Sequence, residues 1–561
     1  MTNHLTDEQR AIGRANAYAA IGGLETGPRA GYPTRRDFLV AAAAAGPALG
    51  ALYFGYTPLG DKPAVRAAII GTGNEGCDAM IRQSNRDYVN YIGYCDARPY
   101  NQQRARDYFG RQDLGQYTKD DIAKLKNYDS IKAVLDDPEV ELVVIALPLW
   151  LHAPVSIDAM KAGKHVFCEK LMGHDIAECK AMIKAARENN RLLAIGHQRH
   201  YSAIYDNANA LVRSGMLGDI RHIRASWHRN NGQLQFAKDD AGNIELDVEG
   251  NPVVLRDDDG NPLYYDSWKP PFMEGDDKVD LDAIAYKASD GKVYSYKNHD
   301  ELVRWRLYDK TGAGLMAELG SHQLDACSIF LGKQHPLAVS GFGGSFYYDD
   351  HREVDDHVFV NYEFPTIGAQ VDSDGMPADK DRVIVSYSSI TTNAFEDYGE
   401  VVMGTYGTMM VSKEYDIYLY KEYDRNKPQS NWAGRSTSIT VEKGSNAMAT
   451  SPSLAGPSQA QSLGAIAAGD GELPSRGYRE ELEHFAYCIR NGDPNDYHGD
   501  AEHQPRCPGP VALADAVIAL TSNLAMRHNA RIEFKPEWFD PESPAVPEAD
   551  FTGRMASRGR A

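Results

Sequence analysis

The chain has 561 residues, with 79 acidic and 59 basic side chains, so its formal charge is −20. This length predicts about two to four domains. A hydrophobic content of 42% with 25% charged residues is typical of a folded protein and excludes a disordered one. The acidic balance argues against a nucleic-acid or anionic-lipid surface, because Lys and Arg supply the affinity for both.

The first sixty residues are predicted to be an export signal and a linker. Residues 34–39 read Thr-Arg-Arg-Asp-Phe-Leu, and an Ala- and Gly-rich apolar stretch follows from Val40 to Tyr53. Paired arginines before a modest apolar stretch resemble a twin-arginine signal, and the stretch is shorter than a membrane span of about 20 residues. A buried Ala-rich helix is the alternative. We expect a periplasmic or exported protein with no membrane segment in its mature form.

Short apolar strands alternate with helices between residues 64 and 197. The strands are expected at 65–71, 91–96, 141–147, 165–168 and 192–195, and helices at 155–162 and 176–188. This alternation predicts βαβ units and a parallel sheet.

Residues 198–540 are predicted to form an α+β domain with a large, open, mostly antiparallel sheet. Its strands are expected at 338–348, 357–364, 382–388, 399–403 and 408–411, and later helices at 479–490 and 511–527. An acidic, turn-rich insertion at 232–300 is expected to form small hairpins, with a calcium loop as the alternative. Residues 436–475 are rich in Ser, Ala and Gly and are expected to form a loop, and residues 541–561 are expected to form a loose tail. The seven cysteines contain no C-x-x-C pair, so we expect buried free thiols and no metal site.

A glycine-rich turn follows the first strand. Residues Gly71-Thr72-Gly73-Asn74-Glu75-Gly76 stand between a predicted strand and a predicted helix, and Asp96 closes the next strand. This is the context of a dinucleotide fingerprint, in which the pyrophosphate lies at the helix N-terminus and the acid binds the ribose. The charge of Asp96 favours NAD, and nearby Arg98 keeps NADP as an alternative. A glycine turn without a ligand is the other interpretation.

Two further segments carry groups suited to proton transfer. Glu169-Lys170 ends a predicted parallel strand, where such sheets bind ligands. Glu318, His322 and Asp325 are spaced i, i+4, i+7 and should share one helix face, where an acid and an imidazole can orient each other. A solvated lysine and a solvated polar face are the alternatives.

Several motifs stand in the order found in the glucose–fructose oxidoreductase / inositol dehydrogenase / MocA family. They are Gly71-x-Gly73-x-x-Gly76, Pro148 with His152, Gly163-Lys164-His165-Val166 with Glu169-Lys170, Gly196-His197-Gln198-Arg199 and Gly320-x-His322-x-x-Asp325. The chain resembles this family over about residues 65–535. Leu171 replaces the usual Pro, and Glu318 replaces the usual Asp.

The resemblance implies a Rossmann domain at 64–197, then an α+β domain whose open sheet often forms an oligomer interface, hence a homo-oligomer (dimer or tetramer). It implies that Lys170 transfers the proton, that His322 is its acid–base partner and that Glu318 orients the substrate. The implied cofactor-binding residues are Gly71, Gly73, Asn74, Glu75, Gly76, Asp96, Pro148, His152, Glu169 and Lys170. The implied substrate-binding residues are Tyr201, Trp227, Arg229, Trp305 and Asp325, with His228 and Arg306 as further candidates.

The sequence thus predicts an exported NAD(P)-dependent oxidoreductase acting on CH–OH groups of a carbohydrate or glycoside, with a tightly bound, recycled cofactor. A redox-neutral glycosidase that oxidises, eliminates, hydrates and re-reduces on the same fold is one alternative. A cofactor-loaded binding protein without turnover is another, and the presence of Lys170 and His322 argues against it.

Overall fold

The computed structural model describes residues 54–111, 116–239, 243–256, 260, 262–264, 266–370, 377–421, 439–441, 448–450 and 476–551. The twin-arginine segment at 34–39 lies outside them, as do residues 451–475 of the predicted loop. Two short strands from that loop, β16 (Ile439–Val441) and β17 (Met448–Thr450), pair with each other.

The first domain is a six-stranded parallel sheet in the order β3-β2-β1-β4-β5-β6. Its strands β4 and β5 are buried at every position, which explains their nearly continuous apolar sequence. The strands are β1 (Val65–Ile70), β2 (Val89–Cys95), β3 (Lys126–Asn127), β4 (Leu142–Ile145), β5 (His165–Glu169) and β6 (Leu193–Gly196).

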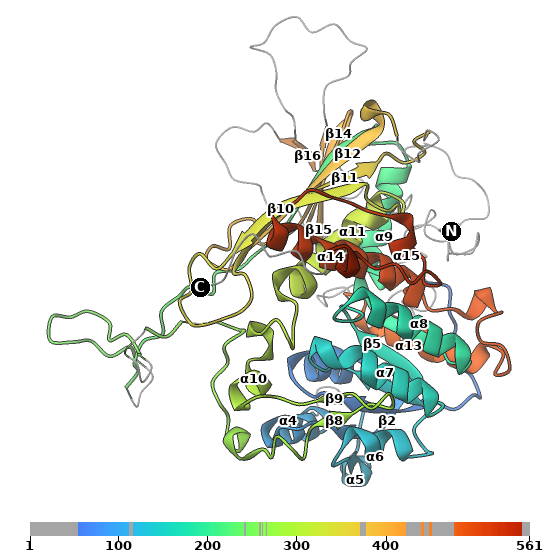
Figure 1. Ribbon diagram of the computed structural model, residues 1–561, viewed down its shortest axis with the longest axis vertical. Coiled ribbons are helices and arrows are strands. Elements are labelled where there is room, and N and C mark those ends of the chain that lie inside the picture. The colour runs from blue at the N-terminus through green and yellow to red at the C-terminus, as the bar shows by residue number, and fades with distance from the viewer. Residues whose placement is uncertain are drawn as a thin grey trace, which may run out of the picture.

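Helices of the first domain connect these strands, and α7 and α8 pack against each other beside β5 (Figure 1). They are the π-helical η1 (Gly76–Ile81), α4 (Pro99–Phe109), α5 (Lys119–Lys124), α6 (Ile131–Asp136), the short η2 (Leu149–Leu151), α7 (His152–Lys161) and α8 (Ile176–Glu188). The predicted Rossmann-like architecture is therefore confirmed.

One helix from the second half of the sequence belongs to the first domain's core. Helix α13 (Tyr478–Asn491) contacts β1, β2, β5 and β6. Its Leu482 and Phe485 are buried in the same cluster as Val65. The sequence predicts this helix but assigns it to the second domain. Periodicity reveals an apolar face but not the sheet that the face covers.

The second domain is built on an eight-stranded sheet in the order β15-β14-β13-β7-β12-β11-β10-β18. The sheet is mostly antiparallel, as predicted, but its central strand β7 runs parallel to β12. Its strands are β7 (Ile220–His228), β10 (Ala338–Gly344), β11 (His357–Pro365), β12 (Arg382–Ile390), β13 (Tyr398–Gly404), β14 (Gly407–Ser412), β15 (Asp416–Lys421) and β18 (Ile532–Glu533).

Helices cover one face of this sheet, and α14 packs on both β10 and α8 (Figure 1). The strands of this eight-stranded sheet carry exposed apolar side chains at Phe342, Phe359 and Ile384. The longer helical elements are η3 (Gln198–Tyr201), α9 (Ala203–Arg213), the π-helical η6 (Met316–Gly320), α11 (Ser321–Phe330) and α14 (Gly509–His528). Among the described residues, α14 is long and apolar enough to cross a membrane, but 72% of its apolar window is buried inside the structure.

The acidic insertion leaves the sheet after β7. The described residues between 234 and 264 pair through bridges such as Phe236–Val254 and Leu246–Pro252 and project from the body as the predicted hairpins (Figure 1). Asp247 there accepts hydrogen bonds from the backbone N–H groups of Glu249 and Asn251, which is ordinary turn chemistry.

The rest of the insertion returns along the first domain, beside α4 and α7 (Figure 1). The Tyr286 hydroxyl donates to Asp158 of α7 at 2.6 Å. This stretch contains η4 (Asp276–Lys278), β8 (Tyr286–Lys287), β9 (Val293–Tyr294), α10 (His299–Val303) and η5 (Trp305–Leu307).

Part of the predicted loose tail is ordered. The Lys180 ammonium of α8 donates to the carbonyl oxygens of Glu537, Ser543 and Ala545, and Glu548 accepts from the backbone N–H of Ile176. These bonds satisfy a buried ammonium and the start of α8, so the chain from α15 (Pro536–Phe539) to α16 (Pro547–Phe551) packs on that helix. All seven cysteines are free and buried, as predicted.

Candidate active site

The glycine turn has the shape that a dinucleotide requires. Gly71 has φ +91°, and a Cβ there would lie 2.3 Å from the Ala146 carbonyl oxygen. A Cβ on Gly76 would lie 2.1 Å from the Gly71 carbonyl oxygen. By contrast, a Cβ on Gly73 would meet no atom within 4 Å, which leaves the backbone open on the side where a pyrophosphate would approach. The residues present therefore fit the cofactor predicted from the motif.

Asp96 lies at the end of β2, beside this turn. Its carboxylate accepts from the backbone N–H groups of Thr72 at 2.7 Å and Arg98 at 2.9 Å. Burial raises its pKa, although these bonds oppose the shift. The carboxylate is half-buried and can still accept from ribose hydroxyls. Asn74, at the tip of the turn, is held by Arg104.

Arg98, whose charge keeps NADP as an alternative cofactor, is already paired with a carboxylate. Its Nε and Nη2 donate to Asp276 of η4 at 2.9 and 2.6 Å, and the Asp276 side chain is fully buried. This fork-to-fork pair joins the insertion to the nucleotide side of the sheet. It also commits the guanidinium that would otherwise be available to a ribose 2′-phosphate. No sequence signal links these two residues, because 178 positions separate them.

Lys170 links the two domains at the end of β5. Its Nζ donates to the backbone carbonyl oxygen of Glu318 in η6 at 2.9 Å. His152 supports the loop from below, with its ring nitrogens 2.7 Å from the Leu171 carbonyl oxygen and 2.8 Å from that of Leu147. Pro148 and His152 stand at the two ends of η2 and so fix the ends of β4 and β5 around Lys170.

Glu318 is a buried carboxylate that stays charged. Arg306 of η5 donates from Nε to its Oε2 at 2.7 Å. Burial alone would raise the pKa of Glu318, but the charges of Arg306 and Lys170 outweigh it and lower that pKa. Trp305 lies directly beneath, with its ring 4.1 Å from the Arg306 guanidinium carbon. Lys170, Arg306 and Glu318 thus form one polar cluster.

His322 lies one turn beyond Glu318, against Trp227 of β7 at a ring distance of 5.2 Å. Burial, with the charges of Lys170 and Arg199, holds the pKa of His322 well below its usual range. The ring is therefore neutral at ordinary pH. Trp227 also stacks on Tyr398 at 4.7 Å and lies 5.4 Å from the guanidinium carbon of Arg229.

Two residues predicted to bind substrate lie elsewhere. The Tyr201 hydroxyl pairs with His484 of α13 and accepts from the backbone N–H of Arg506, so Tyr201 is a buried core residue between the domains. Asp325 does not lie in the polar cluster around Glu318. Its Oδ1 pairs with His200 at 2.9 Å and with Lys333. The π-helical turn η6 breaks the regular i, i+4, i+7 spacing, so the three residues do not share one face.

His197, Asp325 and Asp515 place potential metal-ligand atoms within 4.8 Å of one another, and all three are buried. The Lys333 ammonium bonds to Asp325 and lies 3.5 Å from Asp515. A lysine therefore already supplies the positive charge that these carboxylates need.

Three acidic side chains, Glu75, Glu169 and Glu481, lie close enough for their charges to interact. Burial and the charge of Glu75 raise the pKa of Glu169 well above its usual range, and burial with Glu169 does the same for Glu481 of α13. Glu481 could not be found from sequence, because α13 reaches this site only through the tertiary fold.

Arg199 belongs to the Gly196-His197-Gln198-Arg199 motif, which does not by itself predict a role for its side chain. The Arg199 guanidinium is buried, donates to Glu414 at 2.7 Å and lies over the Tyr205 ring. A separate cavity of about 730 Å³ lies between the β10–β11 loop and Asn523 of α14, and it is lined by neither Lys170, Glu318 nor His322.

A glycine turn ends a parallel strand of the first domain, and Lys170, Glu318 and His322 gather where this domain meets helices η6 and α11 of the second. This arrangement is typical of a two-domain dinucleotide-binding protein. Residues 65–197 match the model of the oxidoreductase family with an NAD-binding Rossmann fold, and residues 290–409 match that of the GFO/IDH/MocA C-terminal domain. In this order, the two matches make residues 65–197 and 290–409 similar to the two domains of GFO/IDH/MocA proteins.

Curated relatives include inositol 2-dehydrogenase of Salmonella typhimurium, 30% identical over 169 residues, which are 29% of this chain and 47% of that protein. Another is glycosyl hydrolase family 109 protein 2 of Phocaeicola vulgatus, 25% identical over 32% of this chain and 42% of that protein. The chain spans about half the length of the curated relatives it matches. An inositol dehydrogenase homologue from Azotobacter vinelandii, solved with NADH and myo-inositol, shares the fold with a TM-score of 0.52 at 14% identity, over 84% of this chain and 98% of that one.

Proposed function

We propose that the protein is a nicotinamide-dependent oxidoreductase acting on a carbinol carbon of a carbohydrate or glycoside. The observation that carries the proposal is the position of Lys170, which ends the nucleotide-binding sheet and bonds to the Glu318 carbonyl oxygen of the second domain. When bound, NAD accepts or returns the hydride of the C–H bond.

The side chains divide the remaining work. Lys170 takes the hydroxyl proton as the C–H hydride leaves, so the carbinol becomes a ketone, and it returns that proton in reduction. Charged Glu318, held by Arg306, accepts hydrogen bonds from neighbouring hydroxyls and orients the ring. Neutral His322 is the second acid–base group, and the indole of Trp227 offers a flat apolar face to a sugar.

A redox-neutral glycosidase is a second candidate, favoured by the similarity to family 109 glycosyl hydrolases. In this cycle C3 is oxidised, the glycosidic group is eliminated, water is added and the ketone is reduced. The two candidates are separated by incubating purified protein with free sugars and with aryl glycosides, with and without NAD. Net NADH formation from free sugars supports the oxidoreductase, whereas release of the aryl alcohol without net NADH supports the glycosidase.

We further propose that the protein is exported and keeps its cofactor bound through each cycle. The support is the coexistence of Thr34–Leu39 with the Gly71–Gly76 fingerprint in one chain. A twin-arginine signal exports folded protein, and no supply of free NAD is expected outside the inner membrane. The Arg98–Asp276 pair, which closes the insertion over the nucleotide side, is also suited to slow cofactor release.

We expect purified protein to complete many turnovers without added nicotinamide. We also expect NAD to be recovered from the denatured protein. Activity that follows added NAD, with NADH accumulating in solution, would contradict the closed cycle and leave an ordinary dehydrogenase.

We also propose a homo-oligomer. Exposed Phe342, Phe359 and Ile384 on the large sheet support an interface there, and sedimentation velocity tests it.

A further inference from the structure

Two arginines frame the root of the insertion. Arg229 directly follows β7, and Trp305-Arg306 stand where the insertion ends. Both arginines lie beside aromatic rings, Arg229 at 5.4 Å from Trp227 and Arg306 at 4.1 Å from Trp305. The insertion therefore leaves and rejoins the second domain at the catalytic cluster, with a guanidinium at each end.

These guanidinium groups carry more positive charge than the cluster balances. Arg306 uses Nε on Glu318, and within the described part of the chain its two Nη groups have no hydrogen bond to protein. Across the same residues, the Arg229 guanidinium has no hydrogen bond and no ion pair. Lys170 adds a third cation, and Glu318 is the one carboxylate bonded to any of them.

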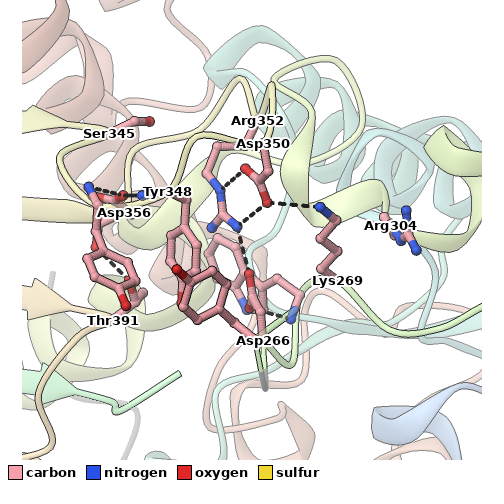
Figure 2. Close-up of polar contacts among 12 residues, drawn as sticks. Asp266, Lys269, Arg304, Ser345, Tyr348, Asp350, Arg352, Asp356 and Thr391 are labelled. Carbon is pink, nitrogen blue, oxygen red and sulfur yellow. Dashed lines mark hydrogen bonds and ion pairs between the residues drawn. The ribbon is translucent and has the colours of Figure 1, made fainter. Parts of the chain in front are cut away.

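The nearby carboxylate that could neutralise Arg229 is taken by another partner. Figure 2 shows Arg352 between Asp350 and Asp266, with Lys269 beside Asp350. The Arg352–Asp266 contact is 2.7 Å, and the Arg352 guanidinium carbon lies 3.7 Å from the Tyr348 ring. Asp266 thus accepts from Arg352 through Oδ2 and from the backbone N–H of Trp268 through Oδ1.

The same network fixes the place of Arg229. The insertion root is bound at Asp266, and the backbone N–H of Arg229 donates to the Ile390 carbonyl oxygen at 2.9 Å. A half-buried guanidinium so held, close enough to Arg306 for the two charges to repel, gains stability when an anion enters between them. Burial and the charge of Arg306 lower the pKa of Arg229, consistent with a missing counter-charge.

We infer that Arg229 and Arg306 form an anion subsite beside the catalytic cluster, so that the substrate is a carbohydrate carrying a negatively charged group, a carboxylate or a phosphoryl group. This inference rests on the proposed oxidoreductase function and narrows its substrate class. A guanidinium fork matches both anions in geometry, and the indole rings of Trp227 and Trp305 each cover one side of a guanidinium.

The test compares matched sugars with the NAD-loaded protein. Each hexose of three configurations is supplied neutral, as its uronate and as its 6-phosphate, and both turnover and calorimetric binding are measured. We expect the charged member of at least one set to exceed its neutral partner at least about 30-fold in kcat/KM and in affinity, as buried charge pairs do. The better charged member identifies the anion.

Variants tie this preference to the subsite. Arg229→Gln should weaken binding of the charged sugar at least about 30-fold, and Arg229→Lys should restore part of it. Arg224→Gln, on the same strand but exposed and paired with Glu396, is the matched control and should keep the preference. Neutral sugars that bind and react as well as their charged partners would overturn the anion subsite and leave the proposed function standing. Absence of turnover on any sugar, with tight binding of charged ones, would instead contradict the function and uphold the subsite.

Discussion

The Lys170 ammonium donates to the backbone carbonyl oxygen of Glu318 at 2.9 Å, joining the end of β5 in the first domain to η6 in the second. This one contact places Lys170, which we propose as the proton-transfer group, where the first domain meets the second. It also fixes the direction of the Nζ, because the bond uses backbone rather than a mobile side chain. The predictions below start from this arrangement.

Lys170→Ala is expected to lower kcat by about 10²–10⁴-fold, since a positioned proton-transfer group is worth that factor. The protein should fold and bind NAD as before, measured by circular dichroism and calorimetry. Lys184→Ala, exposed on α8, is the control and should keep full activity. A Lys170→Ala variant with near-normal kcat would remove Lys170 from the mechanism.

His322→Ala should cost a similar factor in kcat, about 10²–10⁴-fold. Because burial and Lys170 hold the pKa of His322 well below its usual range, no rate step near the ordinary histidine pKa should come from this ring. The check is the pH dependence of kcat for wild type and variant. A wild-type step near neutral pH that disappears in His322→Ala would contradict the neutral imidazole.

Asp96→Ala should weaken NAD binding and narrow the preference for NAD over NADP, because the carboxylate is placed at the ribose end of the fingerprint. Adding Asp276→Asn should narrow it further by freeing Arg98 for a 2′-phosphate. Dissociation constants for both cofactors measure the effect. Unchanged affinities in Asp96→Ala would show that another residue binds the ribose.

Glu400 should make folding stability fall as pH rises. It is fully buried, accepts from Tyr205 at 3.0 Å, and burial raises its pKa to about 8. Its folded pKa lies above the unfolded value, so the folded state holds the proton longer, and stability declines from the unfolded pKa up to about pH 8.

Between about pH 7 and 8 the loss from Glu400 alone is about 1 kcal/mol. Chemical denaturation at both pH values should show a smaller loss for Glu400→Gln than for wild type. Glu188→Gln, at an exposed site, should behave as wild type. Equal pH dependence in all three proteins would argue that Glu400 is ionised in the folded state.

Replacing Arg35 and Arg36 together by lysine should retain the protein in the cytoplasm, because the twin-arginine pathway requires the arginine pair. Cell fractionation with antibody detection measures the outcome, and a Lys62→Arg variant serves as the control. Normal export of the double variant would show that residues 34–39 are not a twin-arginine signal.

Local patterns gave the elements and much of the site. The apolar runs of β1, β4 and β5 and the glycine turn are fixed by nearest neighbours along the chain, so their positions and the Lys170 site could be predicted. The sequence pattern does not predict strand β7. Arg221, His222 and Arg224 interrupt its apolar pattern, and it becomes a central strand only because β12 and β13 pair with it.

The sequence by itself determined the parallel-sheet domain, the dinucleotide fingerprint and the identities of Lys170, Glu318 and His322, since each is encoded by residues a few positions apart. Only the tertiary structure decided that Asp276 pairs with Arg98, that α13 joins the first domain, and that Lys170 bonds to the Glu318 carbonyl oxygen. The Lys170–Glu318 contact joins residues 148 positions apart, and the Arg98–Asp276 pair joins residues 178 positions apart. Burial and charge balance across such distances depend on how the domains pack, and no local pattern records them.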